Sequence, residues 1–237
     1  MRALLALVTV VAIVAVASSL LAPGVATASQ ASRTATSPTA GAPTDGSPAG
    51  GAGEVLATVA VKGRAPKTGY SREQFGAAWS DVDRNGCDTR NDILNRDLAQ
   101  KQWRPGTHGC VVVAGTATDP YTGRVLTFAK ARAWAVQIDH VVALSDAWQK
   151  GAQQWDAATR RAFANDPLEL LAVDGPTNAR KGDGDAATWL PPHKSYRCAY
   201  VARQIAVKGT YGLWVTRAER DAMTRVLDRC PGQLLPT

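Results

Sequence analysis

An acid and a histidine, Asp139 and His140, lie side by side inside an apolar, β-branched run at residues 136–144. A run of this length and composition predicts a buried β-strand. Adjacent residues on a regular strand point to opposite faces, so the two side chains can share one site only if the strand ends or twists there. The fold must therefore bring polar chemistry to the end of a core strand.

The beginning of the chain has the features of an export signal. An apolar segment follows Arg2, with no further charged residue before Arg33, and ends at a small-x-small site, Ala26-Thr27-Ala28. This pattern predicts a signal peptide over residues 1–28. An uncleaved membrane anchor is the alternative, which we disfavour because no basic cluster follows the run. The expected location is secreted or at the exterior of the cell envelope, without stable membrane association after cleavage.

Residues 29–53 are almost entirely Ser, Thr, Ala, Pro and Gly, which predicts a disordered linker. Residues 54–237 are enough for one domain with its own core. The chain has 27 basic and 20 acidic residues, and only Arg2, Arg33 and Asp45 precede residue 54, so this domain carries about +6. That charge permits an anionic partner such as nucleic acid but does not identify one.

Four cysteines, Cys87, Cys110, Cys198 and Cys230, all lie in the predicted domain. None forms a C-x-x-C pair, which argues against a zinc ribbon. An even number in an exported protein indicates two disulfides, with three possible pairings. We favour Cys87–Cys110 and Cys198–Cys230, because each would join neighbouring segments.

The periodicity elsewhere predicts a mixed α+β fold with few strands. Residues 70–83 are expected to form a short helix, because Ser71 and Gln74 have the spacing of a capping box. Two β-rich runs around a turn at residues 119–123 predict a hairpin, and residues 168–173 a further strand. Further helices are expected in the segments 145–155, 156–166, 198–205 and 216–230.

A second segment, residues 165–192, combines a strand, a turn, Asn178 and a mixture of charges. Together, QIDHVVALSDAW, FANDPLELLAV and TNARKGD follow the order strand, excursion, strand, turn and helix. This pattern resembles the HNH endonucleases, the ββα-metal superfamily. More narrowly, residues 70–211 resemble exported bacterial HNH-family proteins related to the C-terminal domain of the GmrSD restriction endonucleases. The resemblance implies a ββα-metal core elaborated with extra helices and a hairpin.

The resemblance also implies roles for individual residues. His140 would be the general base, since a neutral histidine can accept a proton near pH 7. Asp139 and Asn178 would hold one divalent ion, Mg²⁺ in first place with Mn²⁺ or Zn²⁺ as alternatives. A hard cation with oxygen ligands would neutralise the phosphate and stabilise the leaving oxygen. Asp183 and Asp185 are alternative acids for the metal site.

One position departs from the HNH pattern. Nine residues before the final Asn, HNH proteins commonly carry another Asn that braces the loop bearing the histidine, whereas this chain has Glu169. An ionised glutamate accepts hydrogen bonds but donates none. Glu169 would therefore brace the loop in another way, touch the metal, or mark a weakened site.

Three cations are candidates for phosphate binding. Arg180 and Lys181 follow Asn178, and Arg90 lies close to a cysteine. The competing interpretation for the first two is an ordinary solvated helix face. His108 and His193 are expected at the surface.

The stretch DVDRNGCDTRND, residues 81–92, has the acidic spacing of the front of an EF-hand loop. Its final acid is Asp92 rather than Glu, Arg90 lies inside it, and Cys87 would constrain it. We favour a polar turn over a calcium site.

The sequence therefore predicts an exported, metal-dependent endonuclease that hydrolyses nucleic acid, with DNA favoured over RNA and a monomeric state. Low sequence specificity is expected because no base-reading module is visible. By analogy with the superfamily, the products would carry a 5′-phosphate and a 3′-hydroxyl. The alternatives are a catalytically weakened HNH-fold binding module at the cell surface and a calcium-dependent interaction domain.

Overall fold

The computed structural model describes residues 50–236. The predicted signal peptide, residues 1–28, and most of the predicted linker lie outside that part of the chain. The first helix, α1, spans Ala52–Thr58, and the backbone N–H of Ala52 donates to the carbonyl of Gln233. Glu54, the predicted first residue of the domain, lies in the first turn of this helix. Between residues 50 and 236, no helix has the length and apolar character needed to cross a bilayer.

Two small antiparallel sheets confirm the α+β class. One contains β1 (Ala99–Trp103), β2 (Val112–Thr118) and β3 (Val125–Ala129) in that order, so the predicted hairpin is the β2–β3 pair. The other pairs β4 (Val136–His140) with β5 (Leu170–Asp174), the two predicted core strands.

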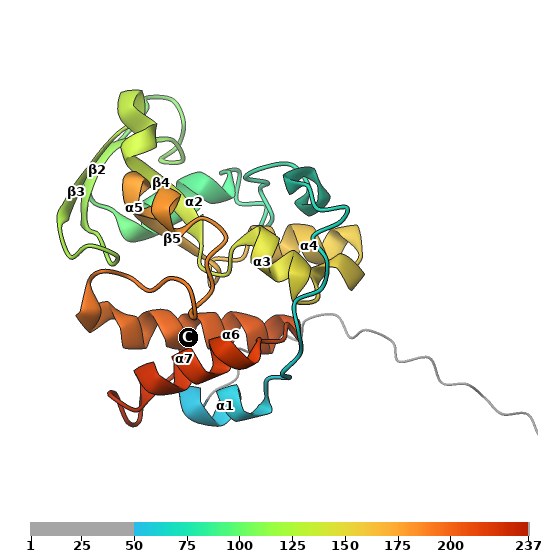
Figure 1. Ribbon diagram of the computed structural model, residues 1–237. Coiled ribbons are helices and arrows are strands. Elements are labelled where there is room, and N and C mark those ends of the chain that lie inside the picture. The colour runs from blue at the N-terminus through green and yellow to red at the C-terminus, as the bar shows by residue number, and fades with distance from the viewer. Residues whose placement is uncertain (1–49, 237) are drawn as a thin grey trace, which may run out of the picture. The chain divides into compact units, whose positions relative to one another are not determined.

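Helices surround the β4–β5 pair, and Figure 1 shows this pair and α5 between the three-stranded sheet and the layer formed by α6 and α7. Alternate residues of β5 enter different cores: Leu170 and Ala172 pack with α2 and β3, whereas Leu171 and Val173 pack with α6. The remaining α-helices are α2 (Thr89–Asp97), α3 (Leu144–Gln149), α4 (Ala157–Ala164), α5 (Gly175–Lys181), α6 (Arg197–Tyr211) and α7 (Arg217–Leu227). The 3₁₀ turns are η1 (Arg72–Phe75), η2 (Lys130–Ala135), η3 (Ala152–Gln154) and η4 (Lys194–Tyr196).

The predicted helix at residues 70–83 is wrong beyond its first turn. Only η1 forms, and the Ser71 side chain makes no capping hydrogen bond. Gly76 follows with φ of 81°, a left-handed conformation that ends the turn. Phe75 is nevertheless buried against Trp148 and Phe163, so the segment contributes to the core as a loop.

Both predicted disulfides are confirmed. Cys87–Cys110 joins the loop before α2 to the segment before β2. Cys198–Cys230 joins the first turn of α6 to the residues after α7. Each bond therefore closes a loop between elements that are neighbours in the fold.

An ion cluster is buried where α3, α6 and α7 meet. The Lys150 ammonium lies 2.8 Å from Asp146, 2.8 Å from Asp185 and 2.5 Å from Glu219. Lys208 and Arg64 complete the set, Lys208 through Glu219 at 3.1 Å and Arg64 through Asp146 at 2.8 Å. Three cations therefore face three carboxylates. We call these six residues the buried ion cluster; a buried charge is tolerated when it is paired in this way.

The buried ion cluster predicts acid-sensitive stability. Burial raises the pKa of Asp185, but Lys150 and Arg64 outweigh it and bring the pKa down from 3.8 to about 2. The contribution of Asp185 is therefore complete above pH 3.8 and is lost as the pH falls through 2. Asp185→Asn should lower the free energy of unfolding at pH 7 by about 2 kcal/mol.

Urea unfolding of the wild type and of Asp185→Asn at pH 7, 4 and 2 measures this difference. The gap between the two proteins should narrow from pH 4 to pH 2. A difference in the free energy of unfolding that stays constant from pH 7 to pH 2 would show that the charge of Asp185 does not contribute to the loss of stability in acid.

Candidate functional site

The candidate site is built on β4, β5 and α5. Asp174 caps α5 by accepting the Thr177 N–H at 2.8 Å, and Pro176 lies in the first turn. Asn178 therefore lies inside the helix, three residues after its first residue, Gly175. A side chain at Gly175 would come within 2.0 Å of the Trp134 carbonyl, so only glycine allows α5 to begin this close to η2.

Asp139 is 5 % exposed and faces α5. Lys181 donates to its Oδ1 at 2.9 Å, and the hydroxyl of Tyr121 donates to its Oδ2 at 2.5 Å. The same ammonium donates to the His140 carbonyl at 2.7 Å. Burial raises the pKa of Asp139, while Lys181 and Tyr121 oppose that effect. Lys181 thus bridges α5 to β4 through both the acid and the backbone.

Asn178 lies near the same face of β4, one helical turn before Lys181. Its side-chain N–H donates to Oε1 of Gln137 at 3.0 Å. Gln137 and Asp139 are two residues apart on a regular strand, so they share a face. The structure therefore brings Asp139, Asn178 and Lys181 together on one side of β4.

In this arrangement the Asp139 carboxylate is held by protein groups rather than open to a divalent ion. Both carboxylate oxygens of Asp139 are engaged, one of them by a cation. Within residues 50–236, no group of three or more His, Cys, Asp or Glu side chains is placed to hold a metal ion. The alternative acids lie elsewhere, Asp183 paired with Lys67 and Asp185 in the buried ion cluster. A metal would need Lys181 and Tyr121 to release Asp139.

His140 points to the other face of β4, because the pairing with β5 stays regular through Asp139 and His140. Its ring is buried, and Nε2 lies 3.0 Å from the Ala164 carbonyl. A carbonyl only accepts hydrogen bonds, so Nε2 carries the proton and Nδ1 holds the free lone pair. Burial, followed by the charge of Arg72, lowers the pKa of His140 to about 3. The imidazole is therefore a neutral base at pH 7.

Trp79 covers His140. The two rings stack with centroids 6.1 Å apart and an interplanar angle of 17°. Arg72, Trp79, Leu144 and Ala164 line a narrow cavity around the imidazole. Trp79 has φ of 58°, in the left-handed region that non-glycine residues rarely adopt. Trp79 and Arg72, two residues that sequence motifs did not single out, therefore border the imidazole.

Glu169 braces the backbone after His140. Both carboxylate oxygens accept the Val142 N–H, at 3.0 and 3.1 Å, and the Glu169 carbonyl accepts the Val141 N–H at 2.8 Å. Burial raises the pKa of Glu169 well above its usual value, opposed by the Val142 hydrogen bond. The glutamate therefore contacts the loop that carries the histidine, as the position of the HNH asparagine implies.

We expect Glu169→Ala to lower the free energy of unfolding by about 1–3 kcal/mol, because the Val142 N–H would remain buried without an acceptor. Glu169→Gln should cost less, since an amide oxygen can still accept that hydrogen bond. Chemical unfolding of the three proteins at pH 7 measures both values. Equal losses in the two variants would contradict the bracing role.

The predicted phosphate-binding cations lie in three different environments. Lys181 is 3 % exposed and paired with Asp139. Arg90 lies over the ring of Phe128, 5.6 Å from its centroid, and burial lowers its pKa. Arg180 is exposed on α5 and donates to the Thr177 hydroxyl at 2.7 Å. Among the three, Arg180 is exposed, Arg90 is partly exposed and Lys181 is buried.

The other polar motifs lie outside this site. In the EF-hand-like loop, the Asn85 amide donates to Asp83 and Asp92, and the Gly86 N–H donates to Asp81. These hydrogen bonds describe a polar turn closed by its own side chains. His108 is exposed, whereas His193 is half-buried with Nδ1 3.2 Å from the Pro120 carbonyl.

Comparison of the sequence with known proteins finds a family match that includes β4, β5 and α5. Residues 88–226, more than half of the chain, match the family model of the GmrSD restriction endonucleases, C-terminal domain. The chain belongs to this family. A protein of Arthroderma benhamiae named "Uncharacterized secreted protein" is 38 % identical over 181 residues, which cover 76 % of this chain and 84 % of that protein. No solved structure matches the chain.

Proposed function

We propose that this protein is an exported endonuclease that hydrolyses phosphodiester bonds of nucleic acid, with DNA as the favoured substrate. The observation that carries the proposal is His140 on the β4–β5–α5 unit, within the residues that match the nuclease family. Its Nε2–H is fixed on Ala164, and its Nδ1 is a neutral base. The fixed tautomer leaves Nδ1 to accept a proton from an attacking water, and a phosphate bound beside the imidazole would raise its lowered pKa toward the working pH.

The other residues of the site would orient the base and the substrate. Glu169 accepts the Val142 N–H in the turn after His140, and the Lys181 ammonium donates to the His140 carbonyl. Arg72 lies at the cavity around the imidazole and is exposed, so it can approach a phosphate there. Such a contact would place the scissile phosphate next to Nδ1.

We also propose that cleavage requires Mg²⁺, with Mn²⁺ or Zn²⁺ as alternatives. Asp139 and Asn178 supply the hard oxygen atoms that such ions prefer, but Asp139 would have to exchange Lys181 for the ion. Cleavage after extensive chelation would argue that the chain acts without a metal.

The direct test is incubation of the purified, oxidised protein with supercoiled plasmid, linear DNA and RNA. Each substrate is tested with Mg²⁺, Mn²⁺, Zn²⁺ and a chelator. Nicked plasmid supports an endonuclease, and end-labelled products report which side retains the phosphate. A folded protein that cuts none of these substrates with any metal would exclude the proposal.

The alternative function is a catalytically weakened binding module at the cell surface. Two observations favour it: Trp79 covers His140, and both oxygens of Asp139 are engaged. Nucleic-acid binding measured by fluorescence anisotropy, together with no cleavage, would identify such a module.

Export and a monomeric state are also proposed. Export is supported by the leader-like sequence, by two disulfides and by a relative named as secreted. Light scattering at several protein concentrations would test the monomer.

A further inference from the structure

A basic cavity lies at the end of the molecule away from His140. It has a volume of about 470 Å³ and lies between the loop before α6, the first turn of α6, and α7. Its rim and floor differ in chemistry. The rim carries four cations, Lys194, Arg197, Arg225 and Arg229, and the floor includes Leu190, Ala222 and Val226. We call this hollow, with the residues named here, the basic cavity.

The four cations of the basic cavity have no acidic partner among residues 50–236. None of them forms an ion pair, and no Asp or Glu lines the cavity. Arg197 donates through Nε to the Pro191 carbonyl, which is neutral. Four like charges around one hollow repel one another, and a bound anion would relieve that repulsion.

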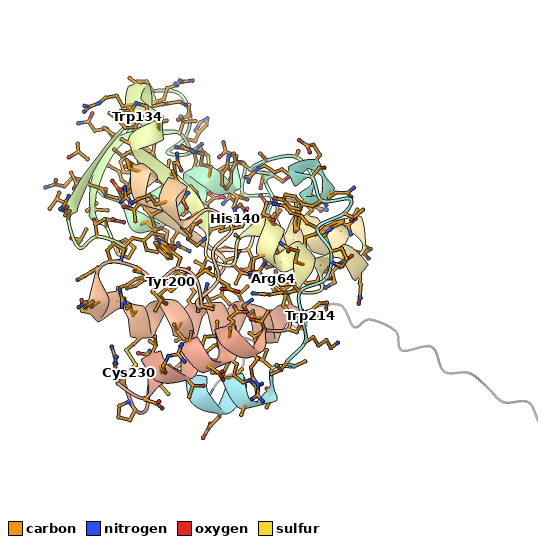
Figure 2. All side chains as sticks on the ribbon, viewed as in Figure 1. Arg64, Trp134, His140, Tyr200, Trp214 and Cys230 are labelled. Atoms are coloured by element: carbon orange, nitrogen blue, oxygen red, sulfur yellow. A yellow bond between two sulfur atoms is a disulfide. The ribbon has the colours of Figure 1, made fainter. Side chains whose placement is uncertain are left out.

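The basic cavity has covalently fixed walls. The Cys198–Cys230 disulfide joins the first turn of α6 to the residues after α7. The first turn of α6 supplies Arg197, and α7 supplies Arg225. In Figure 2, His140 and Cys230 lie on opposite sides of the α6 ribbon. The cavity is therefore a preformed hollow, separate from the candidate active site.

We propose that the basic cavity binds one nucleotide unit of a nucleic-acid chain, with its phosphate on the arginines and its base against the apolar floor. The choice of nucleic acid rests on the proposed function. Guanidinium groups match phosphate oxygens in a two-pronged geometry and stack on flat bases. The volume exceeds that of a free phosphate and falls in the range of small-molecule sites, about 300–1,000 Å³. The cavity thus holds a substrate strand at a distance from the cut.

The test is equilibrium binding of a fluorescent single-stranded oligonucleotide to the full chain. The His140→Ala background and a chelator prevent cleavage, so binding is measured whether or not the protein is a nuclease. Arg225→Ala combined with Arg229→Ala should raise Kd at least tenfold, and Lys194→Ala alone should raise it in the same direction. The matched control, Arg104→Ala combined with Arg217→Ala, removes the same charge from exposed positions outside the cavity and should change Kd less than threefold.

Equal weakening in both double variants would show that only net charge matters and would overturn the site. Competition tests the nucleotide: deoxyadenosine monophosphate should displace the oligonucleotide at a concentration at least tenfold below that of inorganic phosphate. Equal competition by the two would overturn the role of the apolar floor. Binding at the cavity without any cleavage by the wild type would reject the nuclease and leave the site standing.

Discussion

His140→Ala should lower the rate of phosphodiester cleavage by about 100-fold to 10,000-fold, the usual contribution of a positioned general base. The imidazole is the neutral group that the β4–β5–α5 unit holds in a fixed tautomer. His108 is exposed and His193 is held at the Pro120 carbonyl, and neither lines the cavity around the His140 ring. The loss should therefore appear in the maximal rate rather than in substrate binding.

Two variants separate chemistry from folding in this experiment. His140→Gln places a side-chain N–H near the position of Nε2, within reach of the Ala164 carbonyl, but supplies no base, so it should fold like the wild type and remain inactive. His108→Ala removes an exposed histidine and should keep full activity. Plasmid nicking and thermal melting of all four proteins make the comparison. Activity of His140→Gln near the wild-type level would remove His140 from the proposed mechanism.

Lys150→Met should lower the free energy of unfolding by about 3–5 kcal/mol, the typical cost of breaking a buried ion pair by removing one partner. The ammonium contacts Asp146, Asp185 and Glu219, and its side chain is fully buried. Without it, three buried carboxylates would share only Lys208 and Arg64.

Lys67→Met is the matched control for Lys150→Met. Lys67 also pairs with an aspartate, Asp183 at 2.8 Å, but both side chains are about half exposed. Its loss should therefore lower the free energy of unfolding far less than the loss of Lys150. Urea unfolding at pH 7, and again in high salt, measures both variants; the Lys150 effect should persist in salt. Equal effects of the two substitutions would refute the stabilising role of the buried ion cluster.

The sequence predicted those features of the fold that depend on local pattern. Alternating and β-branched runs identified β4 and β5, the turn at Asp119 identified the β2–β3 hairpin, and chain proximity identified both disulfides. The helix at residues 70–83 failed because Gly76 takes a left-handed conformation directly after Phe75. The buried ion cluster could not be predicted, since Lys150 and Lys208 have the spacing of ordinary helix-surface residues. Glu219 reaches both lysines only through the packing of α7, and Asp185 reaches Lys150 from the segment after α5.

The sequence predicted which residues form the site better than it predicted how their side chains are arranged. Motif order placed Asp139, His140, Glu169 and Asn178 on one unit, and the structure assembles that unit. The direction of the side chains followed from strand geometry alone: β4 stays regular through His140, so the acid and the histidine face different layers. The stacking of Trp79 on His140 joins residues about sixty positions apart, and no local pattern reports such a contact.

The buried ion cluster also sets an order of events for a chain that emerges with its N-terminus first. Asp146 belongs to α3 and Lys150 directly follows that helix, whereas Lys208 belongs to α6 and Glu219 to α7, so the last acid becomes available only after α6 has been added to the chain. Until then the centre of the molecule has one uncompensated positive charge and cannot be dehydrated at low cost. Burial of the cluster therefore has to wait for α7, whose Glu219 supplies the third carboxylate.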